Sequence, residues 1–155
     1  MNVEGRNVAG RSVDEQWATL RQRPDIAQIS IRYERMQAEL RDRLSTDIGG
    51  LTWVNDNNEE HGGCGFEFPG VPEGQSRSLA RWVGRGNIPD ARWNDAVAIV
   101  REITRKYGFS TPEVLVNRPA DHEIVVPDPY GGTFNFGTAV NTILSMHTGC
   151  HLPAK

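Results

Sequence analysis

Two cysteines and four histidines are the side chains of this sequence best suited to chemistry. Cys64 lies in the segment HGGCG, three residues after His61. A thiolate nucleophile needs a neighbouring base, and a glycine-rich backbone offers N–H groups that stabilise an oxyanion. This segment is compatible with a small hydrolase or transferase that uses Cys64 with a histidine. It matches no cysteine-hydrolase signature, and no Asn or Asp can be identified as the third member, so we assign no catalytic residue.

The two cysteines could instead be bonded to each other. A disulfide between Cys64 and Cys150 uses both thiols and leaves none unpaired. Closing a loop of roughly 85 residues would stabilise the fold by about 4–4.5 kcal/mol, because the unfolded chain loses entropy. We favour the disulfide over the nucleophile.

A zinc site is the third possibility for these residue types. The segment MHTGCH brings His147, Cys150 and His151 close together, and a structural zinc ion would need a fourth ligand from Cys64 or His61. The spacing matches no standard zinc finger. We therefore expect no metal.

Two turn-rich segments are candidates for contact with a partner. Residues 55–63 (NDNNEEHGG) carry oxygen ligands suited to calcium but lack the spacing of a calcium-binding loop, so a solvated loop is the better interpretation. Residues 127–132 (PDPYGG) place an aromatic side chain in a turn, where we expect it to be exposed. The candidate interaction residues are Asp56, Glu59, Glu60, His61 and Tyr130.

Length and composition limit the classes of protein that fit. A chain of 155 residues with 37% hydrophobic and 24% charged residues is typical of one globular domain. The net charge of −3 provides no basic field for nucleic acid. Its glycine-rich segments match neither a phosphate-binding loop nor a dinucleotide fingerprint, so we expect no cofactor.

The elements that position these residues follow from the hydrophobic period. Residues 1–12 lack an apolar run and are expected to be a flexible arm, without a signal peptide or membrane span, ahead of a single domain over 13–155. A period of three to four predicts helices that begin near Ser12, Asp25 and Asp90, the last with Asp90 as its cap. A period of two predicts strands over 51–54, 66–68, 78–83, 113–117, 123–126, 133–137 and 140–146. This order is typical of an α+β protein, an antiparallel sheet with helices packed on one face.

The order of features from residue 30 to 152 resembles the LppA/LppB-type lipoproteins of mycobacteria and related actinobacteria. The resemblance rests on the amphipathic helix to Leu44, the GLTW strand (50–53), Cys64, the helix WNDAVAIVREITRKYGF (93–109) and the terminal TGCHL (148–152). It implies a precursor with a lipoprotein signal peptide and a lipidated cysteine, both of which we expect to be absent from this chain. It also implies an oxidising envelope location, where a disulfide persists.

These observations favour a non-catalytic binding or interaction module of the cell envelope. We expect it to be extracytoplasmic, either anchored through lipid in the full-length precursor or secreted, with an envelope protein or ligand as its partner. One alternative is the cysteine-dependent enzyme. A second is a secreted inhibitor or immunity-type protein, which predicts an exposed apolar or acidic patch at 55–63 or 127–132.

Overall fold

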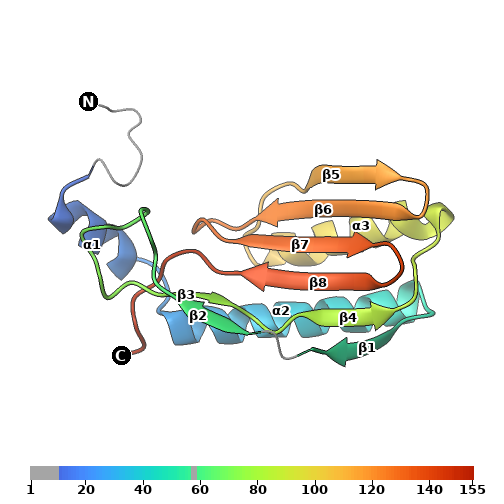
Figure 1. Cartoon of the computed structure of the whole chain (residues 1–155), viewed down its shortest axis with the longest axis horizontal. Helices are drawn as coiled ribbons and strands as arrows, with labels where there is room; N and C mark the ends of the chain where they lie inside the picture. Colours follow the sequence, from blue (N-terminus) through green and yellow to red (C-terminus); the bar gives the residue numbers. More distant parts are fainter. Residues whose placement is uncertain (1–10, 57–58) are drawn as a thin grey trace.

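The computed structural model describes residues 11–56 and 59–155, so most of the expected arm lies outside the described residues. Within these residues the chain forms three helices and an eight-stranded sheet with antiparallel pairings (Figure 1). The elements are α1 (Val13–Arg21), α2 (Ile26–Asp47), β1 (Thr52–Asn55), β2 (Glu60–Gly62), β3 (Ser76–Ser78), β4 (Trp82–Arg85), α3 (Asp90–Lys106), β5 (Glu113–Arg118), β6 (Asp121–Pro127), β7 (Thr133–Thr138) and β8 (Thr142–His147). The expected α+β class is confirmed.

The strands follow the order β1-β4-β8-β7-β6-β5, and the short strands β2 and β3 extend the sheet at one end. Strand β3 meets β8 at Ser78 and His147, and β4 meets β8 further along, from Trp82 to Gly84. Strands β7 and β8, whose strand character the sequence predicts, pair as a hairpin. The two ends of the sheet path are β1 and β5.

Two strand predictions are wrong in part. Residues 78–83 do not form one strand, because Leu79 and Ala80 are both buried, whereas consecutive residues of a regular strand face opposite sides. Residues 66–68 form no strand and lie in a turn and the bend that follows it, and a hydrogen bond from Glu67 N to Cys64 O closes the turn. Phe66 is 92% exposed and Phe68 is buried, so the two rings do not share a sheet face.

Helices α2 and α3 cover one face of the sheet and lie behind it in Figure 1. The amphipathic pattern expected for the helix that begins near Asp25 is confirmed. Six apolar residues three or four positions apart form the buried stripe of α2 and are at most 1% exposed: Ile26, Ile29, Tyr33, Met36, Leu40 and Leu44. In α3, Ile99 and Thr104 are buried, whereas Val97 and Tyr107 are only half-buried. The core therefore forms between these helices and the alternate residues of β6, β7 and β8 that point toward them.

All three helices begin near the residues that the sequence predicts, but the capping residue of the third differs from the prediction. Ser12 and Asp25 both form capping boxes, with Glu15 and Gln28 returning the hydrogen bond. Asp90 does not cap α3, whose N-cap is Pro89 without a side-chain hydrogen bond. Its carboxylate instead accepts hydrogen bonds from the backbone N–H of Ala120 and from the ring of His122.

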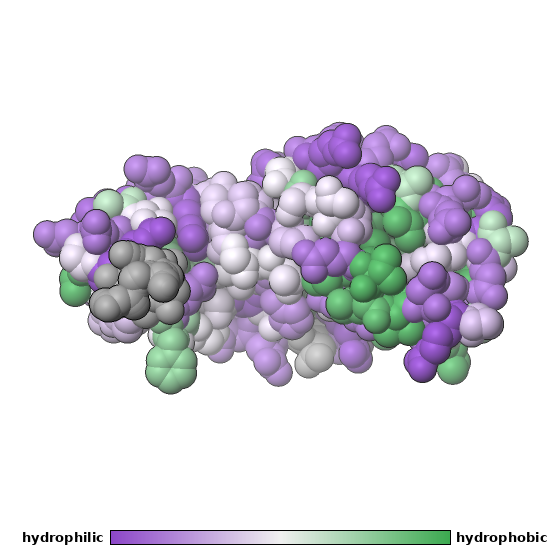
Figure 2. Space-filling view, turned by 90° about the horizontal axis from the view of Figure 1, so that it is seen from above, coloured by the Kyte–Doolittle hydropathy of each residue, from purple (hydrophilic) through white to green (hydrophobic). Residues whose placement is uncertain are grey.

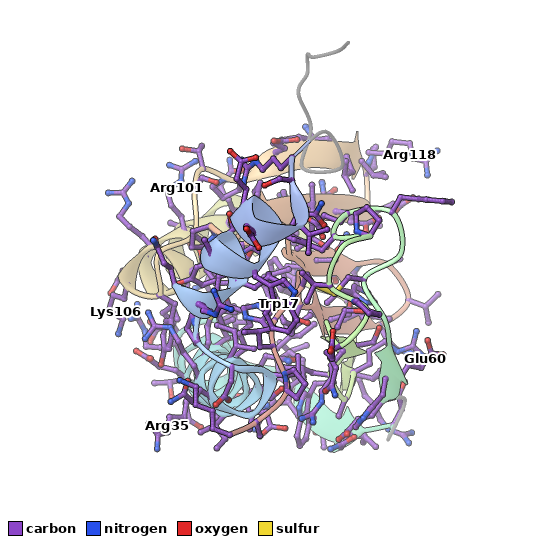
Figure 3. All side chains as sticks on the ribbon, turned by 90° about the vertical axis from the view of Figure 1, so that its left-hand side faces the viewer. Trp17, Arg35, Glu60, Arg101, Lys106 and Arg118 are labelled. Carbon is purple, nitrogen blue, oxygen red and sulfur yellow. A yellow bond between two sulfur atoms is a disulfide. The ribbon has the colours of Figure 1, made fainter. Side chains whose placement is uncertain are left out.

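Helix α1 packs beyond one end of the sheet, where a disulfide joins Cys64 to Cys150 across 86 positions of sequence. Cys150 belongs to a small second cluster with three apolar side chains: Leu20, Phe68 and Val71. Figure 3 looks onto this end and places Trp17 at its centre, whereas Arg35, Glu60, Arg101, Lys106 and Arg118 lie at the periphery. The bond therefore ties the C-terminal segment to the loop that packs against α1.

Buried polar groups join this end to the main core. The hydroxyl of Tyr33 donates to Asp128 Oδ2 at 2.5 Å, and Asp128 Oδ1 accepts from the backbone N–H groups of Tyr130 and Gly132. Burial and the neighbouring Asp128 carboxylate raise the pKa of Tyr33 far above its usual value, so the phenol remains protonated. Asp128 thereby fixes the turn after β6 to α2.

His151 is the second buried polar group at this junction and is 0% exposed. Its Nδ1 lies 2.8 Å from the carbonyl of Pro24, which makes Nδ1 the protonated nitrogen, while Nε2 has no hydrogen-bond partner. Burial lowers the pKa of His151, and the charge of Arg23 contributes to the same effect. The imidazole is therefore neutral in the folded protein at neutral pH.

We expect loss of the disulfide to lower the free energy of unfolding by about 4 kcal/mol. The double variant Cys64→Ser/Cys150→Ser and the reduced wild type should coincide in guanidinium unfolding, both below the oxidised wild type. Equal stability with and without reductant would contradict the assignment of this bond as a major stabilising element.

Removing the Tyr33 hydroxyl should leave Asp128 short of one hydrogen bond in a buried site. We expect Tyr33→Phe to cost about 1–3 kcal/mol in the free energy of unfolding. Tyr107→Phe is the matched control, because its hydroxyl donates to Glu39 near the surface, and it should cost less than about 1 kcal/mol. Equal losses in the two variants would argue against a special role for the Asp128 contact.

The depressed pKa of His151 predicts that stability falls on acidification. Below the unfolded pKa of about 6.5 the unfolded chain takes up a proton that the folded chain resists, so the free energy of unfolding decreases as pH falls from neutrality. We expect His151→Gln to reduce this pH dependence in denaturant titrations. The variant His61→Gln alters an exposed histidine and should retain the wild-type slope; a His151→Gln slope equal to wild type would refute the assignment.

Candidate functional site

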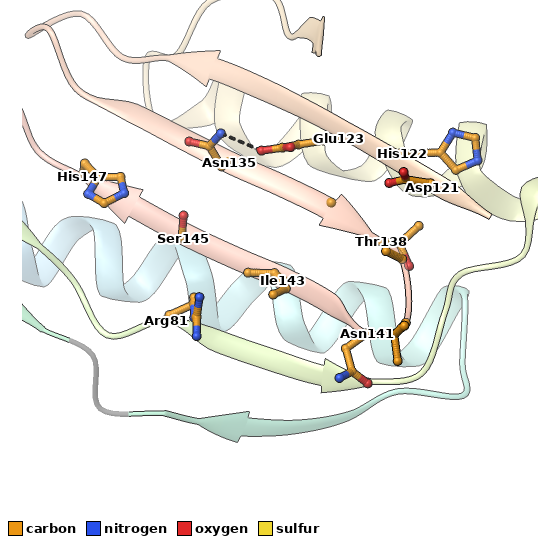
Figure 4. A pocket seen from close by; sticks show the side chains of 13 residues that line it. Arg81, Asp121, His122, Glu123, Asn135, Thr138, Asn141, Ile143, Ser145 and His147 are labelled. Carbon is orange, nitrogen blue, oxygen red and sulfur yellow. Dashed lines mark hydrogen bonds between the residues drawn. The ribbon is translucent and has the colours of Figure 1, made fainter. Parts of the chain in front are cut away.

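The sheet face opposite the helices is uncovered and carries a groove of about 650 Å³ (Figure 4). The groove crosses β8, β7 and β6, and the segment before β4 supplies Arg81. Strand alternation explains much of its composition, because Glu123, Asn135 and Ser145 alternate with buried residues of the core. His122 and Thr138 also line the groove but are themselves buried. The polar side chains of the lining are Arg81, Asp121, His122, Glu123, Asn135, Thr138, Asn141, Ser145 and His147.

Hydrogen bonds within this face hold several of the polar side chains in place. Asn135 donates to Glu123 at 3.1 Å between neighbouring strands, the contact drawn in Figure 4. His147 Nδ1 lies 2.7 Å from the hydroxyl of Ser78. Charges of both signs line the groove, which suits a polar ligand or surface more than an apolar one.

The floor of the groove is formed by residues of β7 and β8, of which Gly137 and Ser145 are small. A side chain at Gly137 would approach the backbone oxygen of His122 at 3.0 Å and the side chain of Glu123 at 3.4 Å. Ser145 and Ile143 continue the floor on β8. The small residues keep the backbone of the sheet accessible along this line.

His122 closes one end of the groove but points into the protein. Its ring is 7% exposed and stacks on Trp93 with ring centres 4.9 Å apart. The hydrogen bond to His122 lowers the pKa of Asp90, with a further contribution from the Ala120 N–H. This histidine therefore joins α3 to the β5–β6 hairpin and has no access to a ligand as a base.

The interaction residues predicted from the acidic loop do not form one site. Asp56 forms an ion pair with Arg81 at 2.6 Å, which connects it to the rim of the groove. Glu60 and His61 lie on β2 and are exposed, opposite Ser78 and Arg77 of β3. Glu59 lines a separate, smaller pocket beside α2.

Tyr130 is not the exposed aromatic residue that its turn suggests. The side chain is half-buried, its ring meets His151 edge to face at 5.4 Å, and the guanidinium of Arg23 lies over it at 5.6 Å. Arg23 also donates to the carbonyl oxygens of Tyr130 and Cys150. These contacts assign Tyr130 to the packing between the end cluster and the sheet.

The disulfide removes the chemical basis of the nucleophile hypothesis, because neither sulfur is a free thiol. Among residues 11–56 and 59–155, no group of three His, Cys, Asp or Glu side chains is arranged to hold a metal ion. His147 and His151, which the zinc hypothesis paired, contact Ser78 and Pro24 respectively.

The inhibitor alternative predicts an exposed apolar or acidic patch at 55–63 or 127–132. The first loop does expose the acidic residues Asp56, Glu59 and Glu60, but the structure places no apolar patch at either loop. In the described part of 55–63 and in 127–132, no large apolar side chain is exposed. Exposed apolar residues occur instead on the edge strand β5, at Val114 and Leu115, and Figure 2 shows an apolar patch over this side of the molecule. A β-bulge at this point of β5 interrupts its regular pairing.

Sequence reasoning missed the groove because its residues belong to strands and not to turns. The signal was present as alternation, since Glu123, Asn135, Ser145 and His147 are polar residues that alternate with buried residues along their strands. Alternation identifies the face of a strand but not which faces of different strands adjoin. Only the strand order brings these four side chains together.

Comparisons with known proteins agree with this architecture. The model of the LppA family, described as a lipoprotein confined to pathogenic Mycobacterium, matches residues 1–154. No curated protein matches the chain. The crystal structure of LppA from Mycobacterium tuberculosis superposes with a TM-score of 0.71 at 18% identity, covering 91% of this chain and 87% of that one.

A second solved structure, a DUF4853 family protein from Actinomyces odontolyticus, superposes with a TM-score of 0.63 at 18% identity, covering 88% of this chain and 73% of that one. At these identities the two structures show a shared fold. Within the described residues, no helix is both long and apolar enough to cross a membrane. The family description indicates an envelope-associated, extracytoplasmic location. The match over residues 1–154 shows that the chain belongs to the LppA family of lipoproteins.

Proposed function

We propose that this protein is a non-catalytic binding module of the cell envelope and that the uncovered face of the sheet is its contact surface. The observation that carries the proposal is the groove of about 650 Å³ across β6, β7 and β8. Its volume is within the range of about 300–1,000 Å³ typical of ligand sites. In this proposal the domain is held near the membrane by a lipid on its precursor or is secreted.

The chemistry of the groove supports binding more than catalysis. Arg81 is engaged with Asp56, Glu123 with Asn135, and His147 with Ser78. Each of these side chains is held by a neighbour in a fixed orientation, which lowers the entropy lost on binding. A rigid polar face of this kind suits an envelope protein or a polar ligand laid across the strands.

The proposal is tested by filling the groove. We expect Asn135→Trp to abolish specific association, because an indole at the centre of the face would exclude a partner. Envelope extract of the source organism would be cross-linked to the biotinylated protein, and the recovered components quantified by mass spectrometry. We expect recovery of the specific component to fall by about tenfold or more with Asn135→Trp.

Asn94→Trp provides the matched control, since Asn94 is exposed on α3 at the opposite side of the sheet. This variant should recover the same component as wild type. If the two variants recover it equally, the uncovered face is not the contact surface. If wild type recovers nothing above background, the binding function itself is contradicted.

A further inference from the structure

The smaller pocket beside α2 contains polar groups that the fold leaves without partners. It has a volume of about 260 Å³ and lies between α2 and strands β1 and β4, away from the groove. From α2 it takes Glu34, Gln37 and Arg41, which are three and four residues apart and therefore share one helix face. Asn55, Glu59, Leu79, Ala80 and Trp82 complete its lining.

Gln37 is the most informative residue of this pocket. The side chain is 1% exposed, yet its amide oxygen Oε1 has no hydrogen-bond partner. A buried acceptor without a donor costs about 1–3 kcal/mol, and most such groups in folded proteins are satisfied. Because Gln37 lines the pocket, a bound molecule with an N–H or O–H group could satisfy this oxygen.

Arg41 supplies an unused positive charge in the same pocket. Its guanidinium stacks on the ring of Trp82 at 3.6 Å from the ring centre, and no carboxylate in the described residues lies within ion-pair distance of it. Partial burial lowers the pKa of Arg41, and the negative charge of Asp42 offsets this effect only in part. Stacking fixes the plane of the guanidinium and leaves its edge available to an anion.

Two carboxylates also line the pocket. Glu34 and Glu59 are both exposed and form no ion pair with another described residue. Glu34 is seven residues before Arg41, about 10 Å along the helix axis, with Gln37 between them. The helix face therefore carries an anion, a neutral acceptor and a cation in that order.

We propose that this pocket binds a free amino acid as its zwitterion. The carboxylate would accept hydrogen bonds from Arg41, and the ammonium group would donate to Gln37 Oε1 and approach Glu34 or Glu59. A simple anion would be repelled by the two glutamates, and a metal cation would be repelled by Arg41. The buried apolar residues Leu79 and Ala80 provide a wall for the side chain of the amino acid.

The size of the pocket supports a ligand of this class. A volume of about 260 Å³ is below the range of about 300–1,000 Å³ that holds drug-sized ligands, but it is sufficient for a single amino acid. The site is separate from the groove proposed as the contact surface, and neither proposal depends on the other.

The test uses the full chain and each of the protein amino acids in turn. Binding would be followed by isothermal titration calorimetry and by the indole N–H signal of Trp82 in ¹H–¹⁵N spectra, assigned with Trp82→Phe. We expect saturable binding of at least one amino acid. Its N-acetyl derivative, which lacks the ammonium charge, and its amide, which lacks the carboxylate, should both bind more weakly by about tenfold or more.

Variants of the two central residues separate binding from stability. Arg41→Gln and Gln37→Leu should each weaken binding by about tenfold or more. Gln37→Leu should leave the melting temperature equal or raise it, because it removes an unsatisfied buried acceptor. Arg35→Gln removes the same charge from an exposed position of α2 outside the pocket and should leave the affinity unchanged.

Three results would overturn the proposal. The first is no saturable binding of any amino acid in the millimolar range. The second is an N-acetyl derivative that binds as tightly as its parent, because the ammonium group would then have no role. The third is the same Trp82 shift on titration with inorganic phosphate, which would indicate a site for anions alone.

Discussion

The burial of only one face of the sheet is the constraint on which the rest of the structure depends. Helices α2 and α3 press against Ile124, Phe134, Phe136, Leu144 and Met146, which are at most 2% exposed. Each of these residues alternates along its strand with one that faces the other way. A shift of any strand by one residue would exchange the two sets, so the core fixes the register and the register fixes the uncovered face.

The end cluster solves a different problem, the attachment of α1 to a sheet that does not extend beneath it. Four buried residues with three half-buried neighbours form too small a core to stand alone. Arg23 compensates by donating to the backbone at Tyr130 and Cys150 while its guanidinium lies over Phe68 and Tyr130. The disulfide adds a covalent link at the same place. It packs so closely against Gly74 that a Cβ atom added at this position would lie 2.7 Å from Cys150 Sγ.

Local patterns in the sequence were sufficient to predict the helices and most strands. The stripe of α2 and the capping boxes at Ser12 and Asp25 depend on residues within a few positions of each other. Predictions failed where a distant partner decides the outcome. Asp90 resembles a helix cap, yet the hairpin around Ala120 recruits its carboxylate, and Tyr130 resembles an exposed turn residue, yet Arg23 and His151 enclose it.

The width of the sheet explains why its two margins are incompletely covered by the helices. Val114 on β5 pairs with the buried Ile124 and so faces the same side, but it is 68% exposed because the helices do not reach this edge. At the other edge Trp53 lies over Gly84 and donates to Ser45, which closes the gap between β1 and α2 at that point. Beyond Trp53, the next helix-facing pair is Asn55 and Trp82, and there the gap stays open as the pocket with Gln37 and Arg41. Two helices under a sheet of this width cover its centre and leave its two edges partly open.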